Sequence, residues 1–223
     1  MAYRRTARVM QRLAARGDAI IAAARALASD QGMQAVQIVP VAARAGIAAG
    51  TVYRYFPAKT DLIAALISAV LEHEITAMQR AADAAPGPLS ALAAVLATFA
   101  ARAQRDRRLA WAVIAEPVEP QVDAVRAALR KEIAAEFEQR IRAAVAGGHV
   151  PEQDAGLAST AIFGALLGGL IGPLAPHIAG DSVVRRETAQ ALTLFSLRAL
   201  GVADAHARGL VMQIDLARPE QGG

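Results

Sequence analysis

The sequence contains no cysteine among its 223 residues. The absence of thiols excludes a disulfide framework and any thiolate-based catalytic or metal site, and it fits a reducing compartment. The basic N-terminus is not followed by the unbroken apolar run of a secretory signal. We therefore expect a cytoplasmic protein, and a chain of this length can bury one or two helical cores.

Acidic residues are scarce in the first 60 positions, which hold two of them against nine Lys and Arg residues. The rest of the chain holds eighteen acidic and fifteen basic residues, so the net charge of +4 arises in the N-terminal segment. A basic segment beside a slightly acidic remainder is the electrostatic footprint of a protein that binds a polyanion. A solvated arginine-rich face is the alternative interpretation.

A local catalytic or metal-binding motif is also missing. His73 and Glu74 do not start a zinc-protease motif, because Ala77 stands where the second histidine would be. The glycines between Gly164 and Gly172 lack the Lys and Ser or Thr of a phosphate-binding loop. We expect no enzyme activity, no metal and no cofactor, although distant carboxylates or histidines brought together by folding stay open as a site.

Residues 35–59 read AVQIVPVAARAGIAAGTVYRYFPAK, two short helical patterns that meet at Gly46. The first helix is expected to begin near Ile38, because Pro40 is tolerated only in the first turn of a helix. Glycine adopts the left-handed turn that ends such a helix without steric strain. With a second helix over about 48–55, this arrangement predicts a helix-turn-helix.

The second of these helices leaves polar, aromatic and cationic groups unburied. Threonine and tyrosine hydroxyls can donate to phosphate oxygens, Arg54 and Lys59 supply positive charge, and Gly50 lets a ligand approach the backbone. A small helical hairpin whose tyrosines only cap a core is the alternative. The predicted DNA-binding residues are Gln37, Ala49, Gly50, Thr51, Tyr53, Arg54, Tyr55 and Lys59.

This part of the chain resembles the TetR family of transcriptional regulators. The resemblance lies within about residues 20–70 and is carried by Ala42, Ala45-Gly46-Ile47, Gly50-Thr51-Val52-Tyr53, Tyr55-Phe56-Pro57, Lys59 and Asp61-Leu62. It implies a dimer with N-terminal DNA-binding domains and a variable C-terminal ligand domain. It also implies phosphate contacts from Tyr53, Tyr55 and Lys59, and a base or phosphate contact from Thr51.

Four positions depart from the family pattern. Gln37 stands where Ser or Thr is common, and Pro40 stands where the family usually has a polar residue. Ala48 and Ala49 open the second motif helix, where Ser and a polar or basic residue are common. Because the side chains of these alanines and of Val39 cannot hydrogen-bond to bases, we expect readout through thymine methyl groups and DNA shape.

Apolar periodicity in the rest of the chain predicts further helices and no strands, so the predicted fold class is all-α. The predicted helices cover about 58–81, 89–104, a short segment ending at 116, 121–146, 157–174 and 182–200. The predicted domains are a three-helix DNA-binding domain at 1–57 with a basic arm at 1–10, a ligand-binding and dimerisation domain at 58–200, and a C-terminal tail at 201–223.

Residues 155–180 carry no Lys, Arg, Asp or Glu, so a membrane span has to be considered. The run is rich in Ala and Gly and contains Pro173 and Pro176, which favours close helix packing in a protein without a membrane partner. The resemblance implies that the last two long helices form a four-helix dimer interface, and one internal core is the alternative. The predicted interface residues are Phe163, Gly164, Leu167, Gly168, Leu192 and Phe195.

Aromatic residues make up only 4% of the chain, and the predicted ligand-binding residues are Met78, Phe99, Trp111, Glu116, Phe137 and Phe163. Aromatic and Met side chains suit an apolar ligand, although each can equally fill a helical core. We predict a homodimeric, ligand-responsive repressor that binds double-stranded DNA at a palindromic operator and responds to a small-molecule effector. The alternatives are an all-helical enzyme or carrier with a structural helix-turn-helix, and an effector-independent DNA binder.

Overall fold

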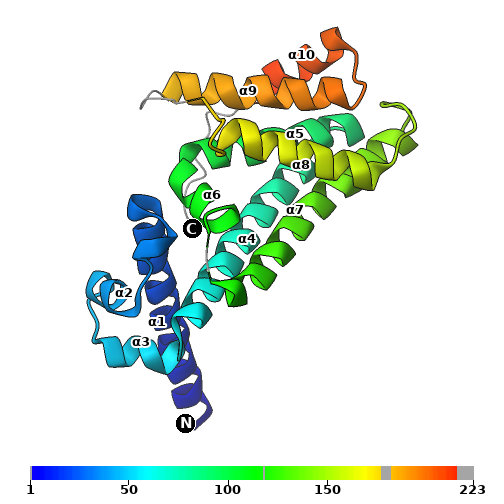
Figure 1. Cartoon of the computed structure of the whole chain (residues 1–223). Helices are drawn as coiled ribbons and strands as arrows, with labels where there is room; N and C mark the ends of the chain where they lie inside the picture. The colour runs from blue at the N-terminus through cyan, green and yellow to red at the C-terminus, as the bar shows by residue number, and fades with distance from the viewer. Residues whose placement is uncertain (1, 118, 177–181, 215–223) are drawn as a thin grey trace. The chain divides into compact units, whose positions relative to one another are not determined.

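The computed structural model describes residues 2–117, 119–176 and 182–214, which form ten α-helices, one 3-10 helix and no strand (Figure 1). The predicted all-α fold class is confirmed. The helices group into two compact units, the first made of Met1–Leu71 and Arg108–Leu129, the second of Glu72–Arg107 and Arg130–Gly223. A segment in the middle of the sequence therefore belongs with the N-terminal helices.

The first unit combines helices from two separate stretches of the sequence. It contains α1 (Ala2–Gln31), the 3-10 turn η1 (Met33–Ala35), α2 (Ile38–Arg44), α3 (Ala49–Tyr55), the start of α4 (Lys59–Asp83), nearly all of α6 (Arg107–Ile114) and the start of α7 (Pro120–Ala146). The first helix extends back to Ala2, so residues 2–10, expected to form an arm, are helical. The side chains of residues 1–12 lie outside the described part of the chain.

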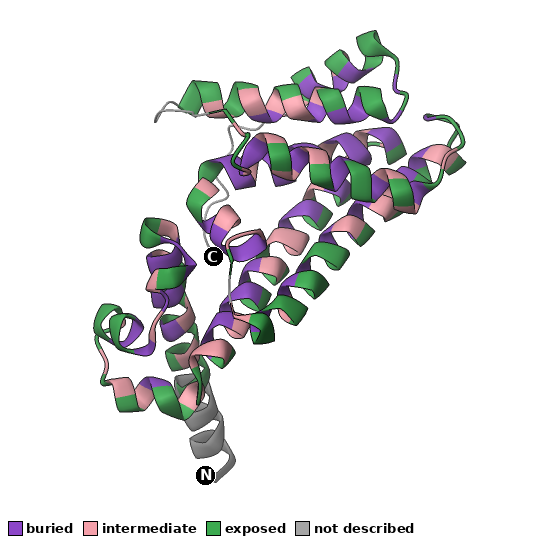
Figure 2. Cartoon of the chain, viewed as in Figure 1, coloured by how far each residue is buried: buried purple, intermediate pink, exposed green. Residues whose placement is uncertain are grey.

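Buried apolar residues of α1, α2 and α3 form the core of the N-terminal helices (Figure 2). We call these three helices, together with Lys59 at the start of α4, the head. Ile20 and Ala24 of α1, Val41 of α2 and Val52 of α3 are completely buried. The first helix contacts the second, and the second contacts the third. Two seven-residue helices alone would bury little apolar surface, so α1 supplies the surface that fixes their angle.

The second unit contains α5 (Pro88–Arg105), α8 (Ala155–Leu170), α9 (Ser182–Ala199) and α10 (Asp204–Gln213), with the C-terminal parts of α4 and α7. The central helix is α5, which packs along α9 and also contacts α8 and α10. Its side chains Leu92, Val95 and Leu96 are completely buried. A hydrogen bond from Gln79 Nε2 to Glu136 Oε2 at 3.3 Å joins α4 and α7 within this unit.

In the described part of the charge-free run, residues 155–176, the one helix is α8, whose 16 residues are fewer than those of the predicted 157–174. Its N-terminus is capped by Asp154, whose carboxylate accepts the N–H of Leu157 at 3.0 Å. The helix stops at Leu170 because Pro173 follows closely and restricts the backbone before it. In the described ranges, every helix is too short or too polar for a membrane crossing.

Close approach of α8 and α9 within the chain depends on Gly169. A Cβ atom added there would lie 2.8 Å from Cδ2 of Leu192, whereas Gly164 and Gly168 face open space. The sequence pattern favours close packing at small residues, but it does not distinguish Gly169 from the other glycines. Gly164 and Gly168, which we predicted to lie in the dimer interface, are on a face that no described residue covers.

The segment expected to be a C-terminal tail contains α10. Leu210 and Val211 are buried, and Ala207 is completely so. Asp204 lies in the first turn of this helix. A hydrogen bond from Arg208 is the main cause that lowers its pKa, and a hydrogen bond from Arg198 is the second. Apolar burial on α9 and α5 therefore holds residues 204–213 in the second unit.

Candidate nucleic-acid interface

The turn between α2 and α3 is fixed by one left-handed glycine and two backbone hydrogen bonds. Gly46 has a φ of 67°. The N–H of Ile47 donates to the carbonyl of Ala42 at 3.0 Å, and the N–H of Gly46 donates to the carbonyl of Ala43 at 3.2 Å. This pair of bonds is the Schellman arrangement, so the predicted glycine turn is confirmed. It determines the direction in which α3 leaves the head.

One side of α3 is open to solvent (Figure 2). Gly50, Tyr53 and Arg54 are exposed, and Tyr53 keeps 51% of its surface accessible. Val52, on the opposite side of the helix, is completely buried. The three exposed residues thus combine an accessible backbone, a phenolic hydroxyl and a cation on one short helix that the core holds in place.

The other predicted contact residues of the helix-turn-helix are half-buried. The ring of Tyr55 lies against α1, because a Cβ atom added at Gly17 would be 3.8 Å from its Cδ1. The side-chain amide of Gln37 donates to the carbonyl of Gln34 at 3.1 Å. Ala49 and Thr51 lie in the first turn of α3. These four half-buried residues stay predicted DNA contacts, and each has less accessible surface than the exposed residues of α3.

Two apolar residues for which we expect methyl contacts also reach solvent here. Val39, in the first turn of α2, is 66% exposed, and Ala48 before α3 is exposed as well. Neither side chain can hydrogen-bond, but methyl groups can contact the C5-methyl group of thymine in the major groove. Val39 therefore belongs with the candidate interface.

The start of α4 places Lys59 at a helix N-terminus. Ala58 lacks a side chain that could cap the helix, but its N–H donates to Asp61 Oδ2 at 3.0 Å. This bond is the acidic half of a capping box, and the carboxylate also suits the positive end of the helix dipole. This hydrogen bond fixes the backbone of the first turn, from which the Lys59 side chain extends.

Lys59 is already paired with an acidic residue of the first unit. Its Nζ lies 2.7 Å from Oε1 of Glu119, in the connection between α6 and α7. The hydrogen bond from Lys59 is the main reason why the pKa of Glu119 lies below its usual value. The pair therefore stabilises the fold above the ordinary carboxylate range, and this contribution is lost as pH falls through the lowered pKa.

The pair is easily broken. The side chains of Lys59 and Glu119 are 26% and 43% exposed. Ion pairs of this exposure contribute about 0–1 kcal/mol, because water and salt screen them. Lys59 can therefore exchange Glu119 for another anion at a small cost in free energy.

Two further hydrogen bonds attach the same region to the head. The N–H of Met33, at the start of η1, donates to Oε2 of Glu116 at 2.9 Å. The guanidinium of Arg108 donates to the carbonyl of Gln31 at 3.0 Å. A Cβ atom at Gly32 would lie 3.0 Å from Glu116 Oε2, so glycine leaves room for the carboxylate. We call Glu116 and Glu119, with the residues between α6 and α7, the acidic connector.

A buried arginine holds the acidic connector in place. Arg126 of α7 is only 3% exposed, and its guanidinium donates to the carbonyls of Ala112 at 3.0 Å, Val113 at 2.9 Å and Glu116. The last carbonyls of a helix lack partners within it, and a buried guanidinium requires acceptors. Arg126 satisfies both requirements at the end of α6, and it thereby fixes the backbone of Glu116.

The predicted ligand-binding residues fall into both units. Phe99, Phe137 and Phe163 form one cluster in the second unit, with ring centroids 5.6, 6.0 and 6.3 Å apart. Met78 of the same unit is completely buried. Trp111 and Glu116 belong to the first unit, and Glu116 is engaged by Met33. Whether these residues bind a ligand stays a prediction.

A buried amide on α5, the helix that also carries Phe99, is only partly hydrogen-bonded. Gln104 of α5 donates through Nε2 to the carbonyl of Leu170 of α8 at 3.2 Å. Its Oε1 has no hydrogen-bond partner within the described ranges, although the residue is 2% exposed. An acceptor buried in this state has lost its hydration, so a donor from water or a ligand would stabilise it. Sequence periodicity alone does not distinguish this glutamine from an exposed one.

The predicted dimer residues divide by exposure. Phe195 is 52% exposed, and Gly164 and Gly168 are exposed too. Leu167 and Leu192 are half-buried, while Phe163 is buried in the ring cluster. The exposed residues Phe195, Gly164 and Gly168 are available to a second copy of the chain. Phe163 and Leu192 instead pack against residues of their own chain.

The ion pair of the acidic connector gives a pH-dependent prediction. Replacing Lys59 by Met should raise the pKa of Glu119 toward the ordinary value of 4.5, because the main stabilising partner of its carboxylate is removed. A pH titration of the Glu119 carboxyl carbon by NMR measures this. Arg54→Met is the matched control, since Arg54 is a cation of the head that is not paired with Glu119, and it should leave the titration unchanged. An identical titration in Lys59→Met and the wild type would show that the pair does not exist in solution.

The sequence and the fold both match those of known regulators. Residues 20–66 match the family profile described as bacterial regulatory proteins, tetR family. The HTH-type transcriptional repressor KstR of Rhodococcus jostii is 41% identical over 96 residues, which are 42% of this chain and 43% of KstR. The chain thus matches less than half the length of this curated relative.

Solved structures with the same fold cover most of the chain. The fatty acid degradation regulator FadR from Bacillus halodurans has a TM-score of 0.72 at 19% identity, over 84% of this chain and 97% of FadR. FadR from Bacillus subtilis, in complex with stearoyl-CoA, has a TM-score of 0.63 at 20% identity, over 88% and 98% of the two chains. Residues 20–66 are thus similar to the tetR family profile, and the solved structures show that the chain as a whole shares their all-helical fold.

Proposed function

We propose that this chain is a transcriptional repressor that binds duplex DNA through α3 and the residues around it. The observation that carries the proposal is the exposed set on α3, Gly50, Tyr53 and Arg54, on a helix-turn-helix within the matched residues 20–66. KstR, which resembles part of this chain, is named a transcriptional repressor. The net positive charge of the first 60 residues also favours binding of duplex DNA, because DNA is a polyanion.

Two kinds of contact are expected in the complex. Tyr53, Arg54 and Lys59 are suited to phosphate oxygens and would set the position of the protein on the duplex. Val39 and Ala48 offer methyl groups to the major groove, where the thymine methyl group distinguishes A·T from G·C pairs. Sequence selection then comes from apolar contacts and DNA shape more than from hydrogen bonds to bases.

Lys59 has two competing partners in this proposal. In the structure it pairs with Glu119, and in the complex with DNA it pairs with a phosphate. Since the pair with Glu119 contributes only about 0–1 kcal/mol, a phosphate can replace it without disturbing the fold. The position of the acidic connector therefore influences the affinity of the head for DNA.

Dimerisation is proposed through the open face of α8 and α9. Leu157, Gly164 and Gly168 follow one another at helical spacing on α8, and Val184 and Phe195 do so on α9. Leu157 is 71% exposed and Phe195 is 52% exposed, a large amount of apolar surface beside two exposed glycines. A second copy would bury these side chains, and a two-fold dimer suits a palindromic operator with half-sites about 34–36 Å apart or a multiple of that.

A small-molecule effector is proposed to act from the second unit. The ring cluster of Phe99, Phe137 and Phe163 is suited to an apolar molecule, and Gln104 Oε1 could accept a hydrogen bond from it. FadR from Bacillus subtilis binds stearoyl-CoA on the same fold. Since α4 and α7 each contribute residues to both units, an effector that favours one arrangement of these helices would change DNA affinity.

DNA binding is tested with two variants of the head. Tyr53→Phe should weaken binding to an operator about fivefold, because it removes one hydroxyl donor. Lys59→Ala should weaken binding about threefold to tenfold and reduce the salt dependence of log K by about one. Fluorescence anisotropy with duplexes from the DNA beside the coding region, between 50 and 200 mM salt, measures both.

Lys131→Ala, in which an exposed lysine of α7 is removed, is the matched control and should leave binding unchanged. If both head variants bind like the wild type, the phosphate contacts are assigned to the wrong residues. If operator and unrelated duplexes bind equally well, the protein is an effector-independent DNA binder without operator selectivity.

Dimerisation is tested at the most exposed aromatic residue of the proposed interface. Phe195→Arg should convert the dimer to a monomer at micromolar concentration, because it brings two charges into an apolar contact. Sedimentation velocity measures the mass of each species. Met212→Arg, which changes a residue of α10 that is 85% exposed, should remain dimeric. A dimeric Phe195→Arg protein would rule out this face of α9 as the interface.

A further inference from the structure

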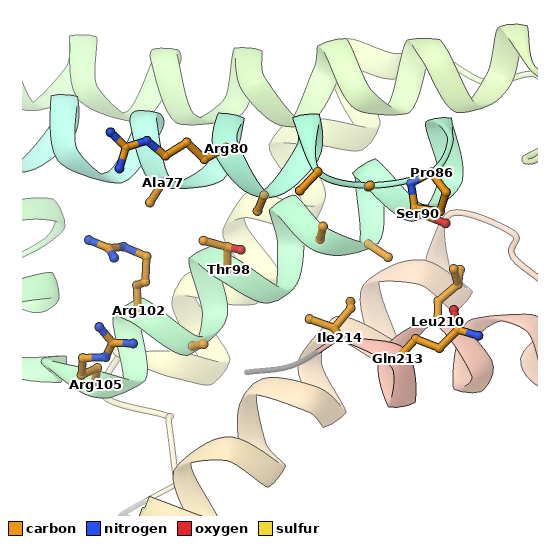
Figure 3. A pocket seen from close by; sticks show the side chains of 16 residues that line it. Ala77, Arg80, Pro86, Ser90, Thr98, Arg102, Arg105, Leu210, Gln213 and Ile214 are labelled. Atoms are coloured by element: carbon orange, nitrogen blue, oxygen red, sulfur yellow. The ribbon is translucent and has the colours of Figure 1, made fainter. Parts of the chain in front are cut away.

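The second unit contains a groove with one cationic end and one apolar end (Figure 3). It has a volume of about 520 Å³ and is lined by the C-terminal turns of α4, the length of α5 and the end of α10. None of its sixteen lining residues is among the predicted ligand-binding residues. Its volume lies within the range of about 300–1,000 Å³ that is typical of small-molecule sites.

Three guanidinium groups lie at one end of this groove. Arg80 of α4 and Arg102 and Arg105 of α5 are grouped there (Figure 3). Arg102 is bound by Glu74, through Nε to Oε2 at 2.6 Å and through a second nitrogen to Oε1 at 2.9 Å. Arg80 and Arg105 form no ion pair with any described residue. This end of the groove therefore carries two uncompensated positive charges.

The rest of the groove is lined mainly by small apolar side chains. Seven alanines from α4, α5 and the connection between them contribute only methyl groups, which leaves the groove wide, and Leu210 and Ile214 form the wall from the end of α10. Thr98 lies between the arginines and this wall (Figure 3). An alkyl chain placed here would lose hydration on most of its surface, and each buried methylene would raise its affinity about fourfold.

From this distribution we infer that the groove binds an anionic amphiphile, a molecule with a carboxylate or phosphate head and an aliphatic chain. The head would bind Arg80 and Arg105, since guanidinium groups donate paired hydrogen bonds to both kinds of anion. The chain would lie along the alanines toward Leu210 and Ile214. This site is distinct from the ring cluster of Phe99, Phe137 and Phe163, and the inference does not depend on DNA binding.

The groove does not use Arg102 as its main cation. Two of its guanidinium nitrogens donate to the Glu74 carboxylate, and its side chain is only 9% exposed. Removing Arg102 would leave the Glu74 carboxylate without this partner in a partly buried position, so an Arg102 variant would test stability more than binding. Arg80 and Arg105 are both exposed and can be replaced without disturbing a buried pair.

The test is isothermal titration calorimetry of the full chain with decanoate and decyl phosphate, which separate the two kinds of head. Acetate and inorganic phosphate represent the head alone, and decyltrimethylammonium represents the chain with the opposite charge. We expect saturable binding of at least one decyl anion. We expect binding at least tenfold weaker for each head alone and for the cation.

Two kinds of variant identify the site. The double substitution Arg80→Gln and Arg105→Gln should weaken binding of the decyl anion at least tenfold, and Ala94→Leu should do so by filling the groove. The matched controls are Arg186→Gln on α9 and Ala135→Leu on α7, which do not line the groove and should bind like the wild type. Circular dichroism verifies that every variant is folded.

Three results would overturn the inference. Equal affinity for decyltrimethylammonium would show that charge plays no role, and equal affinity of decyl phosphate and inorganic phosphate would show that the chain plays none. Unchanged binding by both the double Arg variant and Ala94→Leu would place the amphiphile elsewhere in the protein.

Discussion

The attachment of the acidic connector to the head is the interaction on which the other features depend. Glu116 accepts the N–H of Met33, and Glu119 pairs with Lys59, so two carboxylates hold a backbone group and a side chain beside the helix-turn-helix. Arg126 fixes the connector by binding the last carbonyls of α6. A displacement of the end of α6 would therefore change the surroundings of Lys59.

The energies of these contacts differ in a way that suits regulation. The buried guanidinium of Arg126 cannot leave its carbonyls without a penalty of several kcal/mol, because no water replaces them. The pair between Lys59 and Glu119 is partly exposed and contributes about 0–1 kcal/mol. The connector is thus held firmly to α6 and α7 and loosely to Lys59 of the proposed DNA-binding surface, where a phosphate could compete.

Local features of the fold could be predicted from the sequence. Pro40 placed the start of α2 and Gly46 placed the turn, because each acts through backbone geometry within a few residues. Contacts across long separations could not be predicted. Glu119 is 60 residues from Lys59 and Glu116 is 83 from Met33, and neither carboxylate has a neighbouring residue that indicates its partner.

The same limit explains the partial outcome for the candidate sites. Periodicity identified the aromatic residues of the helices, but only the packing shows that Phe99, Phe137 and Phe163 contact one another while Phe195 is exposed. The sequence pattern also indicated that glycines allow close helix packing, but it did not indicate that Gly169 allows α8 to approach α9 within the chain. The groove beside α10 has no sequence signature, since alanines that line a groove and alanines in a core have the same spacing.

The effect of Glu119→Gln on operator affinity, measured in the wild type and in Lys59→Ala, tests the central claim most directly. If the connector competes with DNA for Lys59, the substitution should strengthen binding about twofold to fivefold in the wild type and leave it unchanged in Lys59→Ala. Equal strengthening in both backgrounds would show that Glu119 acts only through its charge. Unchanged or weaker binding in the wild type would contradict the competition altogether.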